Sequence, residues 1–335
     1  MKAIICERPH ALRIATHAMP SPRDDEVLIR IRRIGLCGTD YHIFAGKHPY
    51  LEYPRVMGHE LAGEILTSPD PSLKEGQDVT LNPYLSCGKC IACRKGKPNC
   101  CVSIRVLGVH ADGGMCEYLT APRRAVIDAS ALTLEQAAMV EFLAIGAHAV
   151  SRARLSSGAR VLVVGAGPIG VGVALFARLD GADVTLMDTR ESRLEHARER
   201  LDFQCTIRSG ETAQSELARR TDGEMFDCVF DATGNVHAMR RGLDYVAHGG
   251  TYVLVSVVKE EIAFPDPEFH KRETTLLASR NAVSADFERV VAAIEKGEIA
   301  TNALLTHRFP ALEAPQRIPE LIANADGVLK AMMEF

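Results

Sequence analysis

The chain has 335 residues and a formal net charge of −4, with 47% apolar and 24% charged residues. These values are typical of a globular protein of about two domains, and they give no reason to expect a nucleic-acid or anionic-membrane partner. Aromatic residues make up only 5% of the chain and tryptophan is absent, which argues further against a nucleic-acid-binding surface.

Two stretches bear on whether the chain carries a targeting or membrane segment. The first, MKAIICERPHALRI, lacks the apolar core of a secretory signal and predicts a β-strand. The second, the uncharged run 161–177, is slightly short for a membrane span and contains four glycines and a proline, which favour a buried strand, turn and helix. We therefore expect a cytoplasmic protein with no membrane partner, in which reduced, clustered cysteines bind metal.

Chemically active side chains are dispersed through three segments. GLCGTDYHIF contains Cys37, VMGHELAGEI contains His59 and Glu60, and AAMVEFLAIGAHAV places Glu141 in an apolar helix. Taken singly, Cys37 is more often a small buried apolar residue, and His59 and Glu60 can be ordinary loop residues. Glu141 either faces solvent or has a cation partner, since an unpaired carboxylate in an apolar helix is costly. Together, a cysteine, a histidine and a carboxylate can form an open zinc site.

The stretch SCGKCIACRKGKPNCC, residues 86–101, contains five cysteines. The spacing C-x2-C-x2-C of Cys87, Cys90 and Cys93 lets a tight loop turn three sulfurs inward, and a fourth thiolate would complete a tetrahedral zinc site. Spacing alone does not choose between Cys100 and Cys101 as the fourth ligand. A site closed by four sulfurs has no open position, so we predict a structural zinc; unrelated surface cysteines are the alternative.

A dinucleotide-binding unit is predicted by RVLVVGAGPIGVGVALFARLDGADVTLMDTR. A strand at 161–164 leads into a glycine loop and a helix, and a second strand at 184–187 ends at Asp188. The loop residues are Gly165, Gly167, Pro168, Ile169 and Gly170. Further strands at 226–234 and 249–258 extend a parallel sheet, with Thr233 and Gly234 in a binding loop. A nucleotide-free α/β crossover is the alternative.

Asp188 also predicts the choice of cofactor. Its carboxylate would accept hydrogen bonds from the adenosine ribose and repel a 2′-phosphate, which favours NAD over NADP. Arg190 and Arg193 are the counter-evidence, because a guanidinium at either position could bind that phosphate.

Six motifs together resemble those of the zinc-dependent medium-chain alcohol and polyol dehydrogenases: GLCGTD, GHELAGEI, CGKCIACRKGKPNCC, VEFLAIGAHA, VGAGPIG and LKAMMEF. The resemblance implies an α/β fold. A catalytic domain with a GroES-like β-barrel would comprise residues 1–143 and 281–335, with a structural zinc loop at 86–101. A Rossmann domain with a doubly wound parallel sheet would comprise residues 144–280. The cleft between them would hold the chemistry.

The resemblance assigns roles to the dispersed residues. Cys37 and His59 correspond to catalytic-zinc ligands, and Glu60 corresponds to a ligand in some polyol dehydrogenases and a neighbouring group in others. Glu141 stands where alcohol dehydrogenases place a third ligand, and a carboxylate there is typical of the polyol branch. Phe142 departs from the proline that this branch usually has.

The same resemblance covers three further positions. The fourth structural sulfur corresponds to Cys101, which leaves Cys100 as a spare thiol. Asp40 would accept a hydrogen bond from the far nitrogen of His59 and so fix its tautomer. Lys330 matches a basic residue that contacts the cofactor pyrophosphate; a solvated surface lysine is the alternative.

The implied activity is oxidation of a secondary hydroxyl of a polyol or sugar acid to a ketone, with two zinc ions per chain and NAD. Zinc would polarise the hydroxyl, Thr39 would hydrogen-bond its oxygen and His42 would pass the proton to solvent, while hydride moves to nicotinamide. Arg280 would hold a distant hydroxyl or a carboxylate, which favours an aldonate over an alditol. Pairing of Arg280 with a neighbouring acid is the alternative.

Other classes explain less of the sequence. A zinc-ribbon nucleic-acid module accounts for four cysteines but not for the glycine loop, and a zinc-free quinone reductase needs neither cysteine set. A metal-binding sensor and an amino-alcohol dehydrogenase of the threonine type are further alternatives. The segment 274–280 predicts an edge strand able to pair across a two-fold axis, so we expect a homodimer or homotetramer.

Overall fold

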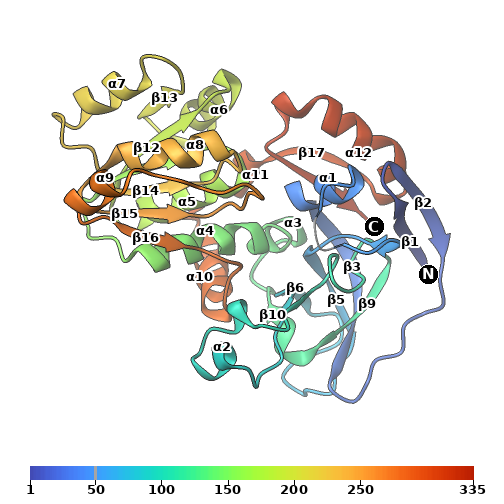
Figure 1. Cartoon of the computed structure of the whole chain (residues 1–335). Coiled ribbons are helices and arrows are strands. Elements are labelled where there is room, and N and C mark those ends of the chain that lie inside the picture. Colours follow the sequence, from blue (N-terminus) through green and yellow to red (C-terminus); the bar gives the residue numbers. More distant parts are fainter. Residues whose placement is uncertain (49–50) are drawn as a thin grey trace. The chain divides into compact units, whose positions relative to one another are not determined.

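The computed structural model describes residues 1–48 and 51–335, and Figure 1 labels its helices and strands. The chain forms two compact units: Met1–Phe142 with Ala282–Phe335 make up the first unit, and Leu143–Asn281 make up the second. Each boundary lies within one residue of the predicted one. The C-terminal segment therefore belongs to the same unit as the N-terminal segment.

The first unit contains a seven-stranded sheet with the order β10-β6-β5-β3-β18-β17, in which β9 also pairs with β3, and two small sheets with the orders β2-β1-β4 and β7-β8. Its strands are β1 (Lys2–Arg8), β2 (Ala11–Thr16), β3 (Glu26–Leu36), β4 (Arg55–Val56), β5 (Glu60–Thr67), β6 (Asp78–Leu81), β7 (Tyr84–Leu85), β8 (Arg105–Val106), β9 (Tyr118–Pro122), β10 (Val126–Asp128), β17 (Leu305–Pro310) and β18 (Lys330–Glu334). Its α-helices are α1 (Gly38–Phe44), α2 (Ile91–Arg94), α3 (Leu134–Ala137), α10 (Ser284–Glu295), α11 (Thr301–Leu304) and α12 (Ala314–Ala323), and α4 (Val140–Ala153) begins in it.

Strand β3 forms the centre of this unit because branched apolar side chains recur along it. At most 1% of the surface of each is exposed: Val27, Ile29, Ile31 and Ile34. β3 pairs antiparallel with β5, and Gly35 lies opposite Glu60. A side chain at Gly35 would overlap the Glu60 carboxylate. This pairing brings Cys37, which follows β3, close to His59, which precedes β5.

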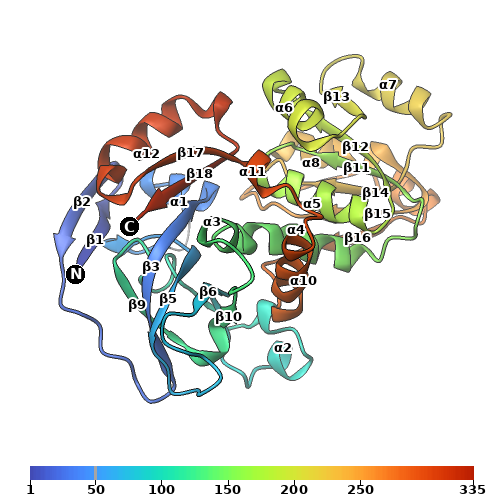
Figure 2. The same ribbon diagram turned by 180° about the vertical axis from the view of Figure 1, so that it is seen from behind.

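The C-terminal strand β18 brings a further residue to the end of β3. β18 pairs antiparallel with β3, with Ala331 opposite Leu36, and Figure 2 shows the red β18 beside the blue β3. Lys330, the residue before Ala331, therefore lies next to the end of β3. Residues that are 270 positions apart in the sequence thus meet at one site.

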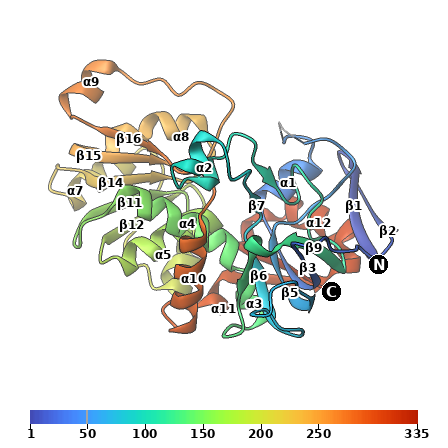
Figure 3. The same cartoon turned by 90° about the horizontal axis from the view of Figure 1, so that it is seen from below.

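The second unit contains a six-stranded parallel sheet with the order β13-β12-β11-β14-β15-β16, as Figure 3 shows for β12 to β16. Its strands are β11 (Arg160–Val164), β12 (Asp183–Asp188), β13 (Thr206–Arg208), β14 (Phe226–Asp231), β15 (Val246–Leu254) and β16 (Thr275–Ala278). Its α-helices, besides most of α4, are α5 (Pro168–Leu179), α6 (Glu191–Leu201), α7 (Ala213–Arg220), α8 (Val236–Arg241) and α9 (Asp266–Lys271). This strand order is that of a doubly wound dinucleotide-binding sheet, so the predicted fold of this segment is confirmed.

The predicted strands and the uncharged run have clear counterparts. The N-terminal strand is β1, and the run 161–177 forms β11, the glycine loop and most of α5. In α5, Val173 and Phe176 are buried, whereas Leu179 at the helix end is 38% exposed. Within residues 1–48 and 51–335, no helix combines the length and apolar character needed to cross a bilayer.

Candidate active site and metal centres

The first candidate metal centre lies where β3 ends and β5 begins. Donor atoms of Cys37, His59 and Glu60 all lie within 4.8 Å of one another. Burial alone would lower the pKa of His59, but the hydrogen bond and charge of Cys37 and the charges of Asp40 and Glu141 raise it well above its usual value. The centre is therefore rich in negative charge, and its sulfur, nitrogen and oxygen donors fit a zinc ion.

Asp40 supports this centre through the backbone. Its Oδ2 accepts the N–H of Cys37 at 3.0 Å, and its Oδ1 accepts the N–H of Gly58 at 3.2 Å. Nδ1 of His59 is 4.0 Å from Oδ1 of Asp40 and has no hydrogen-bond partner in the described part of the chain. The predicted hydrogen bond between His59 and Asp40 is therefore wrong for this structure. Asp40 instead fixes the backbone at Cys37 and next to His59.

Glu141, on the first turn of α4, is 2% exposed and borders the same centre. Its Oε1 accepts a hydrogen bond from the hydroxyl of Tyr84, and among the described residues it does not join the group of three donors. Burial raises the pKa of Glu141 to about 7, although the charge of His59 acts in the opposite direction. In this geometry Glu141 borders the donor group without belonging to it, so its role as a direct ligand stays a prediction. No sequence signal indicates Tyr84, because the contact joins residues 57 positions apart.

Lys330 is 1% exposed, so a solvated surface position is excluded. Its Nζ lies 2.7 Å from both carboxylate oxygens of Glu60 and 3.2 Å from the carbonyl oxygen of Leu36. The ring centre of Phe142 is 4.2 Å from the same nitrogen, which makes a cation–π contact at the position where proline was expected. Lys330 therefore forms a buried ion pair in place of the predicted pyrophosphate contact, because Glu60, the carbonyl oxygen of Leu36 and the ring of Phe142 surround its ammonium group.

The two predicted proton-transfer residues lie three positions apart on α1. Oγ1 of Thr39 is 3.7 Å from Sγ of Cys37, so this hydroxyl lies beside the candidate metal centre. His42 is on the exposed side of the helix, and partial desolvation, followed by the charge of Lys47, lowers its pKa. Residues at i and i+3 share one face of a helix, so the Thr39 hydroxyl beside the centre and the exposed His42 imidazole lie on neighbouring turns of the same face.

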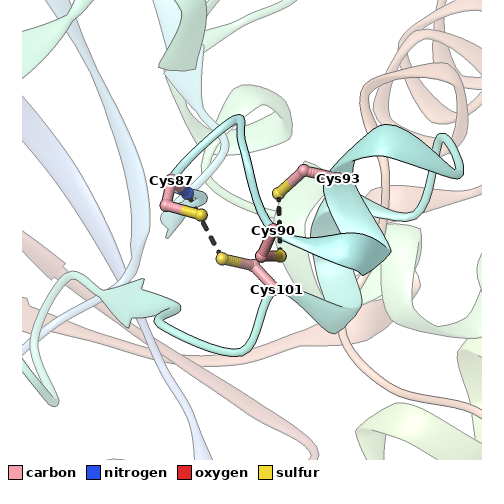
Figure 4. Close-up of side chains that lie close together, drawn as sticks. All are labelled: Cys87, Cys90, Cys93 and Cys101. Atoms are coloured by element: carbon pink, nitrogen blue, oxygen red, sulfur yellow. Dashed lines mark hydrogen bonds between the residues drawn. The ribbon is translucent and has the colours of Figure 1, made fainter.

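The second candidate metal centre is the cysteine loop. Sulfurs of Cys87, Cys90, Cys93 and Cys101 lie within 4.8 Å of one another, and Figure 4 shows them facing a common point. Hydrogen bonds from the backbone of Cys93 and Val102 lower the pKa of Cys90 to about 6, which favours the thiolate that binds metal. Cys100 is exposed and lies outside the set. The geometry therefore selects Cys101, and four sulfurs fit a closed zinc site.

A cavity of about 480 Å³ opens at the carboxyl ends of β11, β12 and β14 in the second unit. Its walls include Gly165, Asp188, Arg190, Arg193 and Thr233. Asp188 accepts the N–H of Ala166 at 2.7 Å and that of Arg190 at 2.9 Å, and Nη1 of Arg193 is 3.5 Å from its Oδ2. A cavity where the strand order reverses is the place where doubly wound sheets bind nucleotides.

The glycine loop beside this cavity has the geometry that the motif predicts. Gly165 has φ +100°, and a side chain at Gly170 would overlap the carbonyl oxygen of Gly165. Gly167 is the N-cap of α5, and Pro168 and Ile169 begin the helix. The turn thus needs glycine at 165, helix packing needs it at 170, and the helix N-terminus is free to face a phosphate. In the loop predicted to be a second binding loop, Gly234 has φ +61° and donates its N–H to Ser256 at 2.8 Å.

Comparison with known proteins identifies a zinc-binding dehydrogenase fold with a nucleotide-binding domain. An alcohol dehydrogenase GroES-like domain matches residues 23–131, and a zinc-binding dehydrogenase domain matches residues 168–296. L-galactonate-5-dehydrogenase of Escherichia coli K12 is 42% identical over 100% of this chain and 99% of its own length. The chain belongs to the zinc-dependent medium-chain dehydrogenase family.

Other members of this family are similar over the same length. Sorbitol dehydrogenase of Bombyx mori is 30% identical over 99% of this chain and 97% of its own length. The structure of the rspB alcohol dehydrogenase of E. coli CFT073, complexed with NADH, has a TM-score of 0.93 at 29% identity and covers 100% of this chain and 99% of that one. The predicted fold class, the enzyme class and the cofactors zinc and NAD are thereby confirmed.

For this medium-chain dehydrogenase we expect Asp188→Ala to weaken the preference for NAD. The carboxylate lies in the cavity wall, and its loss removes repulsion of a 2′-phosphate and releases the Arg193 guanidinium, now 3.5 Å from it, to bind that phosphate. The ratio of kcat/KM for NADP to that for NAD should rise at least roughly tenfold, or about 1.4 kcal/mol. Asp183→Ala, at the other end of β12, is the control. A wild-type enzyme that prefers NADP would show that an arginine binds the phosphate.

Proposed function

We propose that this dehydrogenase oxidises a secondary hydroxyl of a polyhydroxylated substrate to a ketone, with a sugar acid preferred to an uncharged polyol. The observation that carries the proposal is the centre formed by the partly buried Cys37 and the buried His59 and Glu60 in a chain similar throughout its length to an L-galactonate-5-dehydrogenase. Zinc supplies Lewis-acid polarisation of the hydroxyl when it is bound, and NAD accepts the hydride.

The side chains of this chain would then orient the hydroxyl and remove its proton. Thr39 is the hydrogen-bond partner of the substrate oxygen, because its Oγ1 is 3.7 Å from the ligand sulfur of Cys37. His42, on the exposed side of the same helix, accepts the proton and releases it to solvent; its lowered pKa keeps the imidazole neutral and ready to accept. Asp40 keeps Cys37 in position through its backbone N–H.

Arg280 is the proposed substrate carboxylate partner. It follows β16 and is exposed at the carboxyl edge of the parallel sheet, the edge at which such sheets bind their ligands. A guanidinium can bind a carboxylate through two parallel hydrogen bonds, and a hydroxyl only through weaker single bonds. The position therefore supports an aldonate over the matching alditol.

Arg280→Ala should reduce oxidation of an aldonate more than oxidation of its alditol. Loss of a charged hydrogen bond should cost about 1.5–3 kcal/mol in transition-state stabilisation, or roughly 10- to 150-fold in kcat/KM for the acid, and less for the alditol. Arg240→Ala, which removes an arginine bonded to the carbonyl oxygen of Glu261, is the matched control. Equal losses on both substrates would exclude a carboxylate contact. Including amino alcohols in the panel tests the threonine-type alternative.

We also propose that two chains pair through β16 in the cytoplasm. β16 is the edge strand of its sheet, and Leu276 on it is 40% exposed, so unpaired backbone groups are available for a second copy. The ten cysteines are free, which suits a reducing compartment. Sedimentation equilibrium should give a multiple of the 36.5 kDa chain mass; a monomer would contradict this assembly.

A further inference from the structure

Tyr84 links the cysteine loop to the catalytic centre. It forms β7 with Leu85, three residues before Cys87, and pairs with Val106 of β8, so the two strands bracket the loop. Its N–H donates to Oδ1 of Asn82 at 3.0 Å, and its ring meets that of Phe287 edge-on with the ring centres 6.5 Å apart. The tyrosine is therefore held by the backbone on one side and by α10 on the other.

The hydroxyl of this fixed tyrosine donates to Oε1 of Glu141. Glu141 is 2% exposed, and its charge acts on His59, so it stands at the border of the catalytic centre. Among the described residues near this centre, only Cys37, His59 and Glu60 have donor atoms close enough together to bind one metal ion jointly. Tyr84 thus engages a buried carboxylate that borders the centre and stays outside the donor group.

The number of metal donors at the centre explains why the bond between Tyr84 and Glu141 matters for catalysis. Zinc in proteins is usually four-coordinate, and a catalytic site keeps one of the four positions open. Cys37, His59 and Glu60 supply three donors. If Glu141 became a fourth ligand, no position would remain for the substrate oxygen.

We propose that Tyr84 is a positioning residue that holds Glu141 beside the catalytic zinc but outside its ligands, and so keeps the substrate position open. This inference rests on the proposed function, because it requires the metal to bind at Cys37, His59 and Glu60. Tyr84 acts through Glu141 and does not itself touch the substrate.

The test compares Co²⁺ absorption in wild type, Tyr84→Phe, Glu141→Gln and the double variant. The visible spectrum of bound Co²⁺ depends on the number and kind of its ligands. Subtracting the spectrum of the same protein carrying Cys37→Ser removes the contribution of the cysteine loop. Tyr84→Phe keeps the ring against Phe287 but releases Glu141, so its difference spectrum should change. Glu141→Gln and the double variant should both match wild type.

Turnover should follow the spectra. Tyr84→Phe should lower kcat at least tenfold, and adding Glu141→Gln should restore much of that loss, because the amide competes poorly for the metal. Tyr252→Phe, which removes a buried hydroxyl bonded to the carbonyl oxygen of Met239 in the second unit, is the control and should change neither spectrum nor kcat.

The outcomes separate this inference from the proposed function. Identical difference spectra for wild type and Tyr84→Phe would overturn the role of Tyr84. A changed spectrum in Glu141→Gln alone would also overturn it, because Glu141 would then be a ligand with Tyr84 in place; this variant gives an answer even if Tyr84→Phe does not fold. Absence of any Cys37-dependent Co²⁺ signal in wild type would instead refute the catalytic metal centre itself.

Discussion

Replacement of Cys37 by serine is expected to abolish turnover and to leave the fold intact. Cys37 supplies the only sulfur of the catalytic donor group, and a serine hydroxyl does not ionise near neutral pH as a metal-bound thiol does. The loss should exceed the roughly 10- to 100-fold effect of removing a group that only supports a ligand. Cys37 is also the N-cap of α1, and serine is among the residues preferred there, so the helix should keep its stability.

The measurements are turnover with NAD and a sugar-acid panel, zinc content and thermal unfolding. Cys37→Ser should lose one of two zinc ions per chain and keep the wild-type unfolding midpoint. Cys205→Ser is the control, because this half-buried cysteine lies outside both donor groups. Turnover that survives in Cys37→Ser would show that Cys37 holds no metal that catalysis needs.

The cysteine loop was the most predictable part of the molecule because its ligands are local. Cys87, Cys90 and Cys93 lie within seven residues of one another, so a turn is enough to bring their sulfurs together. The choice of Cys101 over Cys100 was not local: Cys101 is 4% exposed and faces the other sulfurs, whereas its neighbour is exposed. Spacing allowed both, and only the resemblance to known dehydrogenases indicated the correct one.

The catalytic centre depends on contacts that sequence spacing does not encode. Cys37 and His59 meet because Gly35 pairs with Glu60 across β3 and β5, a register that residue patterns alone leave open. The bond between Lys330 and Glu60 spans 270 residues and needs β18 beside β3. The motifs therefore predicted the candidate ligands Cys37, His59 and Glu60, which the structure brings together. The partners of Glu60 and Glu141 follow from packing, which no single segment determines.

The glycine loop is intermediate between the cysteine loop and the catalytic centre in how far the sequence predicts its contacts. The positive φ of Gly165 and the tight packing at Gly170 are properties of one turn, so the motif predicts them directly. The neighbours of Asp188 are partly local, since Arg190 and Arg193 follow it within one turn of α6. Its bond to the N–H of Ala166 joins the end of β12 to the loop after β11 and needs the parallel sheet in place.

Replacement of Cys90 by serine should have the largest effect on stability. The loop has little apolar support of its own: α2 contains no buried residue, and Ile91 and Val102 are 56% and 73% exposed. A loop of this kind keeps its shape mainly through its metal, since structural zinc contributes directly to folding. Cys90→Ser should therefore lose the loop zinc, lower the unfolding midpoint by several degrees and expose residues 86–104 to proteases.

Metal binding at the catalytic centre distinguishes loss of the loop zinc from general unfolding. Cys90→Ser should keep the Cys37-dependent Co²⁺ signal, and Cys100→Ser, the matched change in the same loop, should behave as wild type because that thiol lies outside the donor group. The same logic predicts that replacing all four loop cysteines leaves one zinc, bound at Cys37 and His59. A wild-type chain with a single zinc, still bound after those four replacements, would refute the structural site, because the sulfurs that face one another in the loop would then hold no metal at all.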